Sequence, residues 1–420
     1  MGHGEICVNI WLITIGESVP ATDGNNIKLN RAAILADLLC REGHGVVWWT
    51  STFDHEKKRH RFDGDRSIEI SPRYRLVLLH GTGYRKNISL ARIVDHLLLA
   101  YKFFRRAQRA PRPDKIVCSY PTIELSYAAV KYGRRKKIPV VIDVRDLWPD
   151  YFLTAFPQSV RPVIKVFLFP FFQMKRSVFR QASAIVGTSP PYVAWGLKEA
   201  RRNKTSGDAD FPLADKKGPP GPIEMKRAET FWNGLQVHKS RFILCFVGVI
   251  NKKFELETLI EAAGRLRDRG DILFVICGTG DRLAFYREKS KRMGNLIYPG
   301  FVGEAEKRAL MLRSKIGLAP YHSTEEFKNN CPTKIFEYLS SGLPLLSCLK
   351  GIVETLLAAH QCGLTYANRN VEDFLGKLNY LIENAEVLRS LSRNAFKLYE
   401  QKFVADKVYT EMMNHVARRE

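Results

Sequence analysis

The chain has 420 residues, of which 45% are hydrophobic and 26% are charged, and its 66 Lys and Arg outnumber its 43 Asp and Glu. This length predicts two or three domains, and the ordinary composition excludes disordered and collagen-like proteins. No uncharged apolar stretch approaches the roughly 20 residues that cross a bilayer. The N-terminal residues include Glu5 but no early Lys or Arg, unlike a secretory signal. We therefore expect a cytoplasmic protein.

Short apolar runs alternate with longer helical patterns along residues 1–200. A helix with Ile34, Leu38 and Leu39 on one face follows the first strand and a polar loop at 17–26. This alternation indicates parallel βαβ units, and hence an α/β, doubly wound sheet. Strands are expected at 7–15, 46–50, 76–80, 115–118, 139–144 and 184–186.

The rhythm breaks at residues 201–240, where many charges and a Gly-Pro-Pro-Gly-Pro run are typical of a linker. After residue 240 the alternation of short apolar runs with helical patterns resumes, and the tail from 371 to 417 has helical patterns only. Two Rossmann-like domains with a ligand in the cleft between them are the simplest interpretation. The expected strands are 242–247, 272–277, 296–298, 316–318 and 343–346. The expected domains are 1–200 (N-terminal), 201–240 (linker), 241–400 (C-terminal) and 401–420 (a helix that either returns to the N-terminal domain or mediates dimerisation).

Two glycine turns in the second half are candidates for contact with a ligand. Gly248 ends an apolar run and is followed by Lys252 and Lys253 before a helix, an arrangement that attracts phosphate. Gly278 opens a Gly-Thr-Gly-Asp turn that is not a G-x-G-x-x-G fingerprint and lacks an acidic residue at the ribose spacing. A cleft-facing turn and a merely tight turn explain Gly278 equally well.

The segment 329–344 carries the strongest signal. Pro332 suits the first turn of a helix, whose free N–H groups attract an anion. Glu337 follows about one turn later, where its carboxylate is able to accept hydrogen bonds from a ribose diol. A solvent-exposed salt bridge is the alternative interpretation of Glu337.

This segment resembles the donor-site signature of retaining family 4 glycosyltransferases, which have the GT-B fold of two facing Rossmann-like domains. The Gly-His-Gly-Val sequence at 43–46 resembles a helix-to-strand step of the same family. Segments 49–55 and 144–150 resemble a subgroup that builds bacterial surface polysaccharides. The resemblance extends from about residue 8 to 400.

The resemblance implies a donor site for a nucleotide sugar. Gly248 and one of the two lysines would face the diphosphate, the start of the helix after Pro332 would offer N–H groups to the distal phosphate, and Glu337 would hold the ribose. Residues 329–332 would line the transferred sugar, and the loop 17–26 would close over the cleft. The candidate donor-binding residues are Gly248, Lys252, Lys253, Gly278, Asn329, Asn330, Cys331, Pro332, Thr333, Lys334 and Glu337.

Two departures from the family pattern leave a catalytically silent protein as an alternative, although a subgroup that tolerates both changes is the interpretation we favour. Many members carry a second glutamate eight positions before Glu337, where this chain has Asn329. Many also place a histidine after the strand at 115–118, where this chain reads Cys-Ser-Tyr-Pro.

The chemistry that the resemblance implies is transfer of a sugar from a nucleoside diphosphate with retention of configuration. We expect a UDP-sugar and a sugar of an N-acetylated hexosamine type, although no residue distinguishes uridine from guanosine. Lysines and a helix N-terminus are able to neutralise the leaving diphosphate without a metal or another cofactor. A D-x-D spacing occurs at Asp208 and Asp210, but within the expected linker. Asp146 and His55 are the candidate catalytic residues that would assist the acceptor hydroxyl, although either residue could be purely structural.

Residues 1–200 hold 31 basic but only 17 acidic side chains, which implies a polyanionic partner. Segments 96–112 and 162–180 combine bulky apolar with cationic residues, as do helices that lie on anionic membranes; core helices with charged ends are the alternative. We expect a peripheral enzyme on the inner face of the cell membrane that extends a lipid-linked glycan.

Two other functions fit parts of the sequence. The net charge of +23 would suit a nucleic-acid-binding protein, but no zinc-finger spacing, RNP-like strand or basic heptad region is present, and we expect no nucleic-acid partner. A sugar-nucleotide epimerase would use the same fold, but the basic apolar segments and the Pro-Thr-Lys-x-x-Glu-Tyr run favour transfer.

Overall fold

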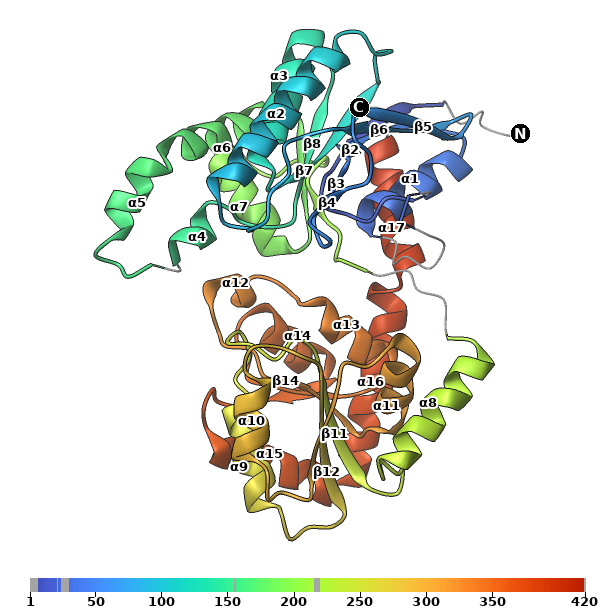
Figure 1. The fold of residues 1–420 in the computed structure, drawn as a ribbon, viewed down its shortest axis with the longest axis vertical. Helices are drawn as coiled ribbons and strands as arrows, with labels where there is room; N and C mark the ends of the chain where they lie inside the picture. Colours follow the sequence, from blue (N-terminus) through green and yellow to red (C-terminus); the bar gives the residue numbers. More distant parts are fainter. Residues whose placement is uncertain (1–6, 21, 24–29, 155, 215–219, 419–420) are drawn as a thin grey trace. The chain divides into compact units, whose positions relative to one another are not determined.

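The computed structural model describes the chain except residues 1–6, 21, 24–29, 155, 215–219 and 419–420, and it divides into two compact units (Figure 1). Unit 1 comprises Met1–Lys217 and Ala405–Glu420, and unit 2 comprises Gly218–Val404. Each unit is a sheet covered by helices. No helix in the described part of the chain is long and apolar enough to cross a membrane.

Unit 1 contains a sheet of eight strands in the order β10-β9-β8-β7-β1-β2-β6-β5. The pairing of β5 with β6 is antiparallel and the other pairings are parallel. The strands are β1 (Asn9–Ile13), β2 (Gly45–Ser51), β5 (Arg66–Ser71), β6 (Tyr74–Leu79), β7 (Lys115–Tyr120), β8 (Val140–Val144), β9 (Ala184–Gly187) and β10 (Ala209–Asp210), with a separate pair β3 (Phe53–Asp54) and β4 (Arg59–His60). The helices are α1 (Arg31–Arg41), α2 (Leu90–Ala107), α3 (Ile123–Lys136), α4 (Asp150–Thr154), α5 (Arg161–Phe167), α6 (Phe169–Gln181), α7 (Pro190–Ala200) and α17 (Ala405–Ala417).

Both faces of this sheet are buried because successive side chains of a strand point to opposite faces. In β1, Trp11 and Ile13 join a cluster with α2, α3, α6 and α7, whereas Ile10 and Leu12 join one with α1 and α17. A continuous apolar run is the sequence pattern of such a two-sided strand. The predicted doubly wound arrangement is therefore confirmed for this unit.

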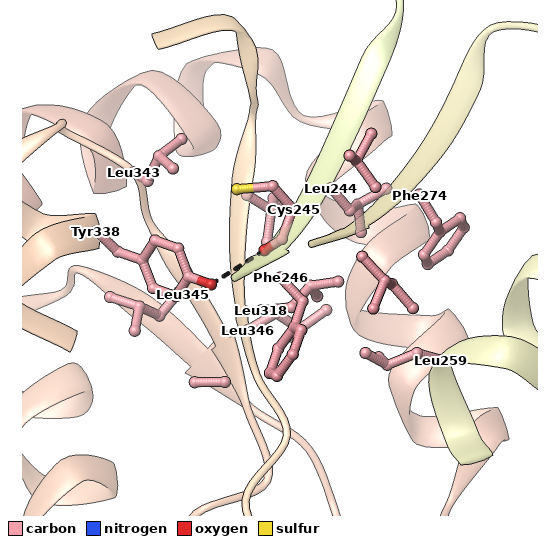
Figure 2. Close-up of a cluster of buried hydrophobic side chains, with 14 of the residues drawn as sticks. Leu244, Cys245, Phe246, Leu259, Phe274, Leu318, Tyr338, Leu343, Leu345 and Leu346 are labelled. Carbon is pink, nitrogen blue, oxygen red and sulfur yellow. Dashed lines mark hydrogen bonds between the residues drawn. The ribbon is translucent and has the colours of Figure 1, made fainter. Parts of the chain in front are cut away.

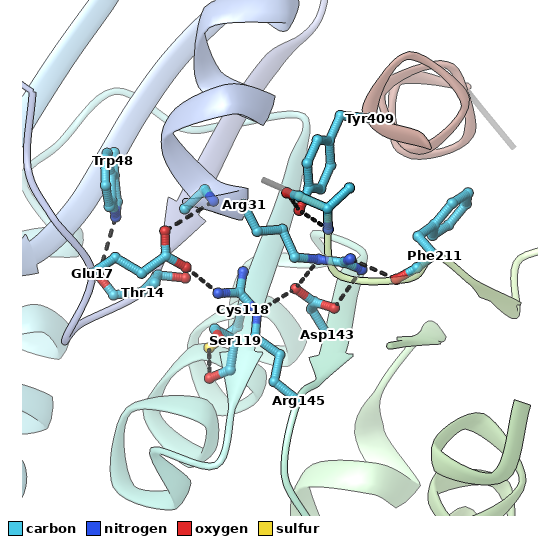
Figure 3. Close-up of polar contacts among 12 residues, drawn as sticks. Thr14, Glu17, Arg31, Trp48, Cys118, Ser119, Asp143, Arg145, Phe211 and Tyr409 are labelled. Carbon is cyan, nitrogen blue, oxygen red and sulfur yellow. Dashed lines mark hydrogen bonds and ion pairs between the residues drawn. The ribbon is translucent and has the colours of Figure 1, made fainter. Parts of the chain in front are cut away.

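A buried ionic network joins α1 to β8 (Figure 3). Arg31 donates two hydrogen bonds of 3.0 Å to the carboxylate of Asp143, and the two side chains are each 1% exposed. Arg145 also contacts Asp143, at 2.7 Å, and donates to Glu17. Tyr409 of α17 donates to the carbonyl of Ala214 at 2.7 Å, so the last helix belongs to unit 1. The network also ties down the described part of the loop 17–26; residues 21 and 24–26 lie outside the described residues.

Unit 2 contains six strands, all parallel, in the order β13-β12-β11-β14-β15-β16. Figure 2 shows part of its core, in which Leu244, Phe246, Phe274 and Leu318 pack together. The strands are β11 (Phe242–Val247), β12 (Ile272–Cys277), β13 (Leu296–Gly300), β14 (Ile316–Ala319), β15 (Leu345–Ser347) and β16 (Gly363–Thr365). The helices are α8 (Pro222–Gly234), α9 (Glu257–Arg265), α10 (Leu283–Lys289), α11 (Glu304–Arg313), α12 (Glu325–Lys328), α13 (Thr333–Ser340), α14 (Ile352–His360), α15 (Val371–Glu383) and α16 (Ala385–Lys402).

Residues 201–240, expected as a linker, divide between the two units. Their first part adds the short strand β10 to the edge of the sheet of unit 1. Their second part forms α8, whose Trp232 is fully buried in the core of unit 2 and donates to the carbonyl of Glu306 at 2.7 Å. The proline of the Gly-Pro run at 222 begins this helix, where its missing N–H costs nothing.

Candidate functional site

The two predicted glycine turns touch each other at the carboxyl edge of the sheet of unit 2. β11 and β12 are neighbours, with Val247 opposite Cys277, so the turns that follow them meet. A Cβ on Gly278 would lie 1.8 Å from the carbonyl oxygen of Gly248, and Gly278 has a φ of +135°. Only glycine allows this close approach of two backbones. The structure therefore places Gly278 beneath Gly248, where it shapes the turn.

Helix α13 is fixed beside this turn by its own tyrosine. The hydroxyl of Tyr338 donates to the carbonyl of Cys245 at 3.3 Å (Figure 2). It also accepts from the N–H of Val247 at 3.1 Å. Tyr338 is fully buried. These bonds hold the helix against the last residues of β11, so the predicted helix start and the predicted glycine turn belong to one site.

The side chain of Lys334 lies under the glycine turn. A Cβ on Gly248 would lie 2.2 Å from Lys334 Nζ. The ammonium lies 3.9 Å from the ring centre of Phe246 and 4.4 Å from that of Phe254. It is buried, and the described residues offer it no hydrogen-bond partner. Burial lowers the pKa of Lys334 to about 7, although Glu337 opposes that shift.

Glu337 is held by a lysine that the sequence analysis did not identify. Lys307 of α11 donates to the Glu337 carboxylate at 2.7 Å and lies 3.1 Å from Glu304. Burial opposes the charge on Lys307, but the two carboxylates keep its pKa above the usual value. Lys307 is 14% exposed and Glu337 30% exposed, so this is a partly buried ion pair with one open side.

The remaining predicted donor-site residues lie on the two segments that border the turn. Lys252 and Lys253 are exposed in the loop after β11, and Lys253 Nζ lies 5.9 Å from the ring centre of Phe327. Asn329 ends α12, and Pro332 precedes α13 as its N-cap. Asn330, Cys331 and Thr333 are half-buried between these positions.

The two predicted catalytic residues lie in unit 1 and are not brought together. His55 lines a cavity of about 200 Å³ and its Nδ1 lies 2.6 Å from the hydroxyl of Tyr84. Burial, reinforced by Lys58 and Arg92, lowers the pKa of His55. Asp146 is exposed just after β8 and does not line that cavity.

The same cavity contains a second histidine that sequence reasoning missed. His96 of α2 lies with its Nδ1 3.5 Å from a carboxylate oxygen of Glu124. Its Nε2 is buried and has no hydrogen-bond partner among the described residues. The nearby carboxylate favours the tautomer with its hydrogen on Nδ1, in which Nε2 is a hydrogen-bond acceptor. The cavity is lined by Ile15, Gly16, Ser51, Phe53, His55, Tyr84, Arg92, Asp95, His96, Pro121 and Thr122.

The described residues contain no group of three or more His, Cys, Asp or Glu side chains that could hold a metal ion. Asp208, the first residue of the D-x-D spacing, is occupied by two bonds from Arg202, at 2.5 and 2.7 Å. It also accepts the N–H of Ile185 at 2.8 Å. Its carboxylate therefore fixes the end of α7 against β9.

Comparison with known proteins identifies the fold and one domain. Residues 229–398 match the family model described as "Glycosyl transferases group 1". The sucrose-phosphate synthase of Thermosynechococcus elongatus is similar, with a TM-score of 0.66 and 15% identity over 97% of this chain and 98% of that chain. HepE of Anabaena, solved in complex with UDP, has a TM-score of 0.62 and 13% identity over 97% and 98% of the chains. WaaG, a glycosyltransferase involved in lipopolysaccharide biosynthesis, has a TM-score of 0.61 and 12% identity over 97% and 99%.

No protein of curated function matches this chain in sequence. At these low identities, the structural likeness shows the fold alone. The chain has the GT-B fold of two Rossmann-like domains, as the sequence predicted.

Proposed function

We propose that this chain is a retaining, metal-independent glycosyltransferase that moves a sugar from a nucleoside diphosphate, in the first instance UDP, to a lipid-linked glycan. The match of residues 229–398 to group 1 glycosyl transferases is the premise. The observation that carries the proposal is the meeting of Gly248, Lys334 and Glu337 at one edge of the sheet of unit 2. A glycine turn, a buried cation and a carboxylate suit a diphosphate attached to a ribose.

The diphosphate binds at the glycine turn and at the start of α13. The first N–H groups of a helix have no partner within it, and the helix dipole favours an anion there. Gly248 lets the phosphate oxygens come close to the backbone. Glu337 accepts hydrogen bonds from the ribose hydroxyls on its open side while Lys307 fixes its other oxygen. HepE, which shares the fold, was crystallised with UDP.

In the transfer step, the bond between the anomeric carbon and the diphosphate oxygen breaks, and its electron pair leaves with the diphosphate. The acceptor hydroxyl attacks the same face of the sugar, and its proton passes to the leaving diphosphate. Charge grows on that diphosphate during the step, so a fixed cation and a helix N-terminus stabilise the transition state more than the ground state. An N-acetylated hexosamine is the sugar we expect to be transferred.

The acceptor hydroxyl binds in unit 1, in the cavity of His55 and His96. In this cavity, Nε2 of His96 is available as a hydrogen-bond acceptor, and polar side chains line the rim. These features suit a hydroxylated ligand of the size of one sugar ring. His55 assists there, with its pKa lowered so that the neutral imidazole prevails at pH 7.

The acceptor is carried by a membrane surface, and two helices of unit 1 carry side chains suited to binding it. In α5, no described residue is buried, and Val166 and Phe167 are 73% and 75% exposed. In α2, Leu90, Val94, Leu97 and Tyr101 form an exposed apolar stripe at helical spacing. A basic pocket containing Lys165, Arg176 and Arg180 borders α5. Apolar residues flanked by cations bind an anionic bilayer surface, here the inner face of the cell membrane.

The donor site is tested by calorimetric titration with UDP, GDP and a short DNA duplex, on the wild type and on Glu337→Ala. We expect micromolar binding of one nucleoside diphosphate. The alanine variant should bind roughly 10- to 100-fold more weakly, because a hydrogen bond to a charged group contributes about 1.5–3 kcal/mol. Lys307 keeps Glu304 as a partner, so the fold should survive. Salt-sensitive duplex binding without nucleotide binding would refute the proposal.

A further inference from the structure

The ammonium of Lys334 is buried and has no hydrogen-bond partner among the described residues, which is costly unless a ligand supplies one. We propose that the Lys334 ammonium is the counter-ion of the donor diphosphate and that it takes up a proton when the nucleotide binds. The inference rests on the proposed function and adds a proton linkage to it.

Lys334 Nζ lies directly against the glycine turn. Nζ lies where a side chain on Gly248 would be, so the hydrogen of that glycine is what separates the ammonium from the turn. Three rings, Phe246, Phe254 and Tyr321, lie 3.9, 4.4 and 5.7 Å from Nζ by their centres. The faces of these rings attract the cation, but a ring face accepts no conventional hydrogen bond. The first strong partner for Nζ is thus an anion bound at Gly248.

Without a bound nucleotide, the groups around Lys334 do not fully stabilise its protonated form. Glu337, on the same helix, favours the charged form, but Lys307 binds that carboxylate and itself opposes the charge. Cys245 of β11 stays neutral because burial raises its pKa to about 12. Tyr321 also stays neutral, since burial raises its pKa. Desolvation therefore dominates and lowers the pKa of Lys334 to about 7.

Nucleotide binding and the protonation of Lys334 are therefore linked, and each favours the other. The empty site loses the Lys334 proton as the pH rises through about 7. A bound diphosphate stabilises the ammonium and raises that pKa, so the complex keeps the proton. At pH 8 the empty site is about nine-tenths deprotonated, and binding should take up nearly one proton per nucleotide. Affinity should fall by up to about tenfold between pH 6 and 8 through this group alone.

The test is calorimetric titration of the full chain with UDP, or with GDP if UDP does not bind, at pH 8 in two buffers of different ionisation enthalpy. The difference in observed heat gives the number of protons taken up. The β-phosphate of a free nucleoside diphosphate is fully ionised at this pH, so it contributes no exchange. We expect uptake close to one proton for the wild type and none for Lys334→Met.

Lys315→Met is the matched control, because Lys315 is exposed and precedes β14, at the edge of the sheet opposite the glycine turn. This variant should keep the proton uptake of the wild type. Lys334→Met should bind at least tenfold more weakly than the wild type at pH 6, and the two affinities should converge as the pH rises to 9. Loss of uptake together with a weaker Kd at pH 6 is not expected from a merely structural role.

Two results overturn different parts of the account. Nucleotide binding by the wild type without proton uptake would refute the role of Lys334 and leave the proposed function intact. No nucleotide binding at any pH would refute the proposed function itself. The wild-type measurement decides the inference even if Lys334→Met does not fold.

Discussion

Phe167→Ser is expected to weaken the binding of this chain to anionic membranes. Phe167 ends α5, is 75% exposed and follows Val166, which is 73% exposed. Full burial of a phenylalanine side chain contributes about 1.5–3 kcal/mol. Three-quarters of that side chain is available to a bilayer, so its removal should cost about 1–2 kcal/mol, or roughly 5- to 30-fold in vesicle affinity.

The measurement is co-sedimentation with vesicles of phosphatidylcholine alone and with 30% phosphatidylglycerol, at low salt and at about 0.5 M salt, where the Debye length is only a few ångströms. The wild type should bind the anionic vesicles more tightly, and salt should reduce that preference. Phe167→Ser should reduce binding at both salt concentrations, since the lost contact is apolar. The variant should fold normally, because no described residue of α5 is buried.

Phe301→Ser is the matched control. Phe301 is 78% exposed, but it belongs to unit 2, whereas the basic apolar helices belong to unit 1. Its replacement should leave vesicle binding unchanged. Equal binding of the wild type to neutral and anionic vesicles at low salt, or an equal loss in both variants, would contradict the assignment of α5 to a membrane.

Two further predictions concern unit 1. Arg31→Met should lower the free energy of unfolding of this unit by about 3 kcal/mol in a urea titration. The reason is that the substitution leaves the buried Asp143 with Arg145 as its remaining cation. A loss below about 1 kcal/mol would contradict the stabilising role of this ionic network. Asp208→Asn should cost about 1–2 kcal/mol at pH 7 and only a few tenths of a kcal/mol, roughly, at pH 2. Burial opposes the charge on Asp208, but Arg202 and backbone N–H groups lower its pKa to about 2, so its contribution is present above pH 4 and lost as the pH falls toward 2. A destabilisation that does not change with pH would refute this.

Most of the strands that the sequence predicted have apolar runs that are buried on both faces; β13, with one buried residue, is an exception. β11 and β12 begin and end where predicted, because all six residues of β12 and four of β11 are buried. β5, β10 and β16 were not predicted. β5 is an edge strand with alternating exposed polar residues, and β10 and β16 have two and three residues. Strands this short or polar form because a neighbouring strand offers hydrogen bonds, which a local pattern does not reveal.

The candidate donor site illustrates a second limit. The sequence predicted the helix start at Pro332, and the structure has α13 begin at Thr333. The burial of Lys334 and its approach to Gly248 depend on the pairing of β11 with its neighbours and on the tyrosine bond to Cys245, so no local spacing reveals them. Lys307 lies 30 residues before its partner Glu337. The sequence contains many lysines, and nothing in the local pattern distinguishes the one that the fold places beside a carboxylate.

The proposed acceptor cavity was harder to predict from the sequence than the candidate donor site. His96 lies on α2, within a segment that reads equally as a membrane-binding or a core helix. The structure gives this helix two distinct faces: Leu99 and Phe103 are buried, whereas Leu97 and Tyr101 are half exposed. The interaction of His96 with Glu124 of α3 requires two helices that pack side by side. A helical plot of residues 90–107 would separate the faces but would not predict that partner.

The most direct test of the proposed function is product analysis after incubation with a panel of UDP- and GDP-sugars and a polyprenyl-diphosphate-linked glycan. We predict that one nucleotide sugar releases its nucleoside diphosphate only when the lipid acceptor is present, without added metal. The transferred sugar should keep its anomeric configuration by NMR. Release of an isomerised sugar without lipid would instead identify an epimerase, and an inverted linkage or no turnover with any donor would contradict the retaining transferase proposed for this chain.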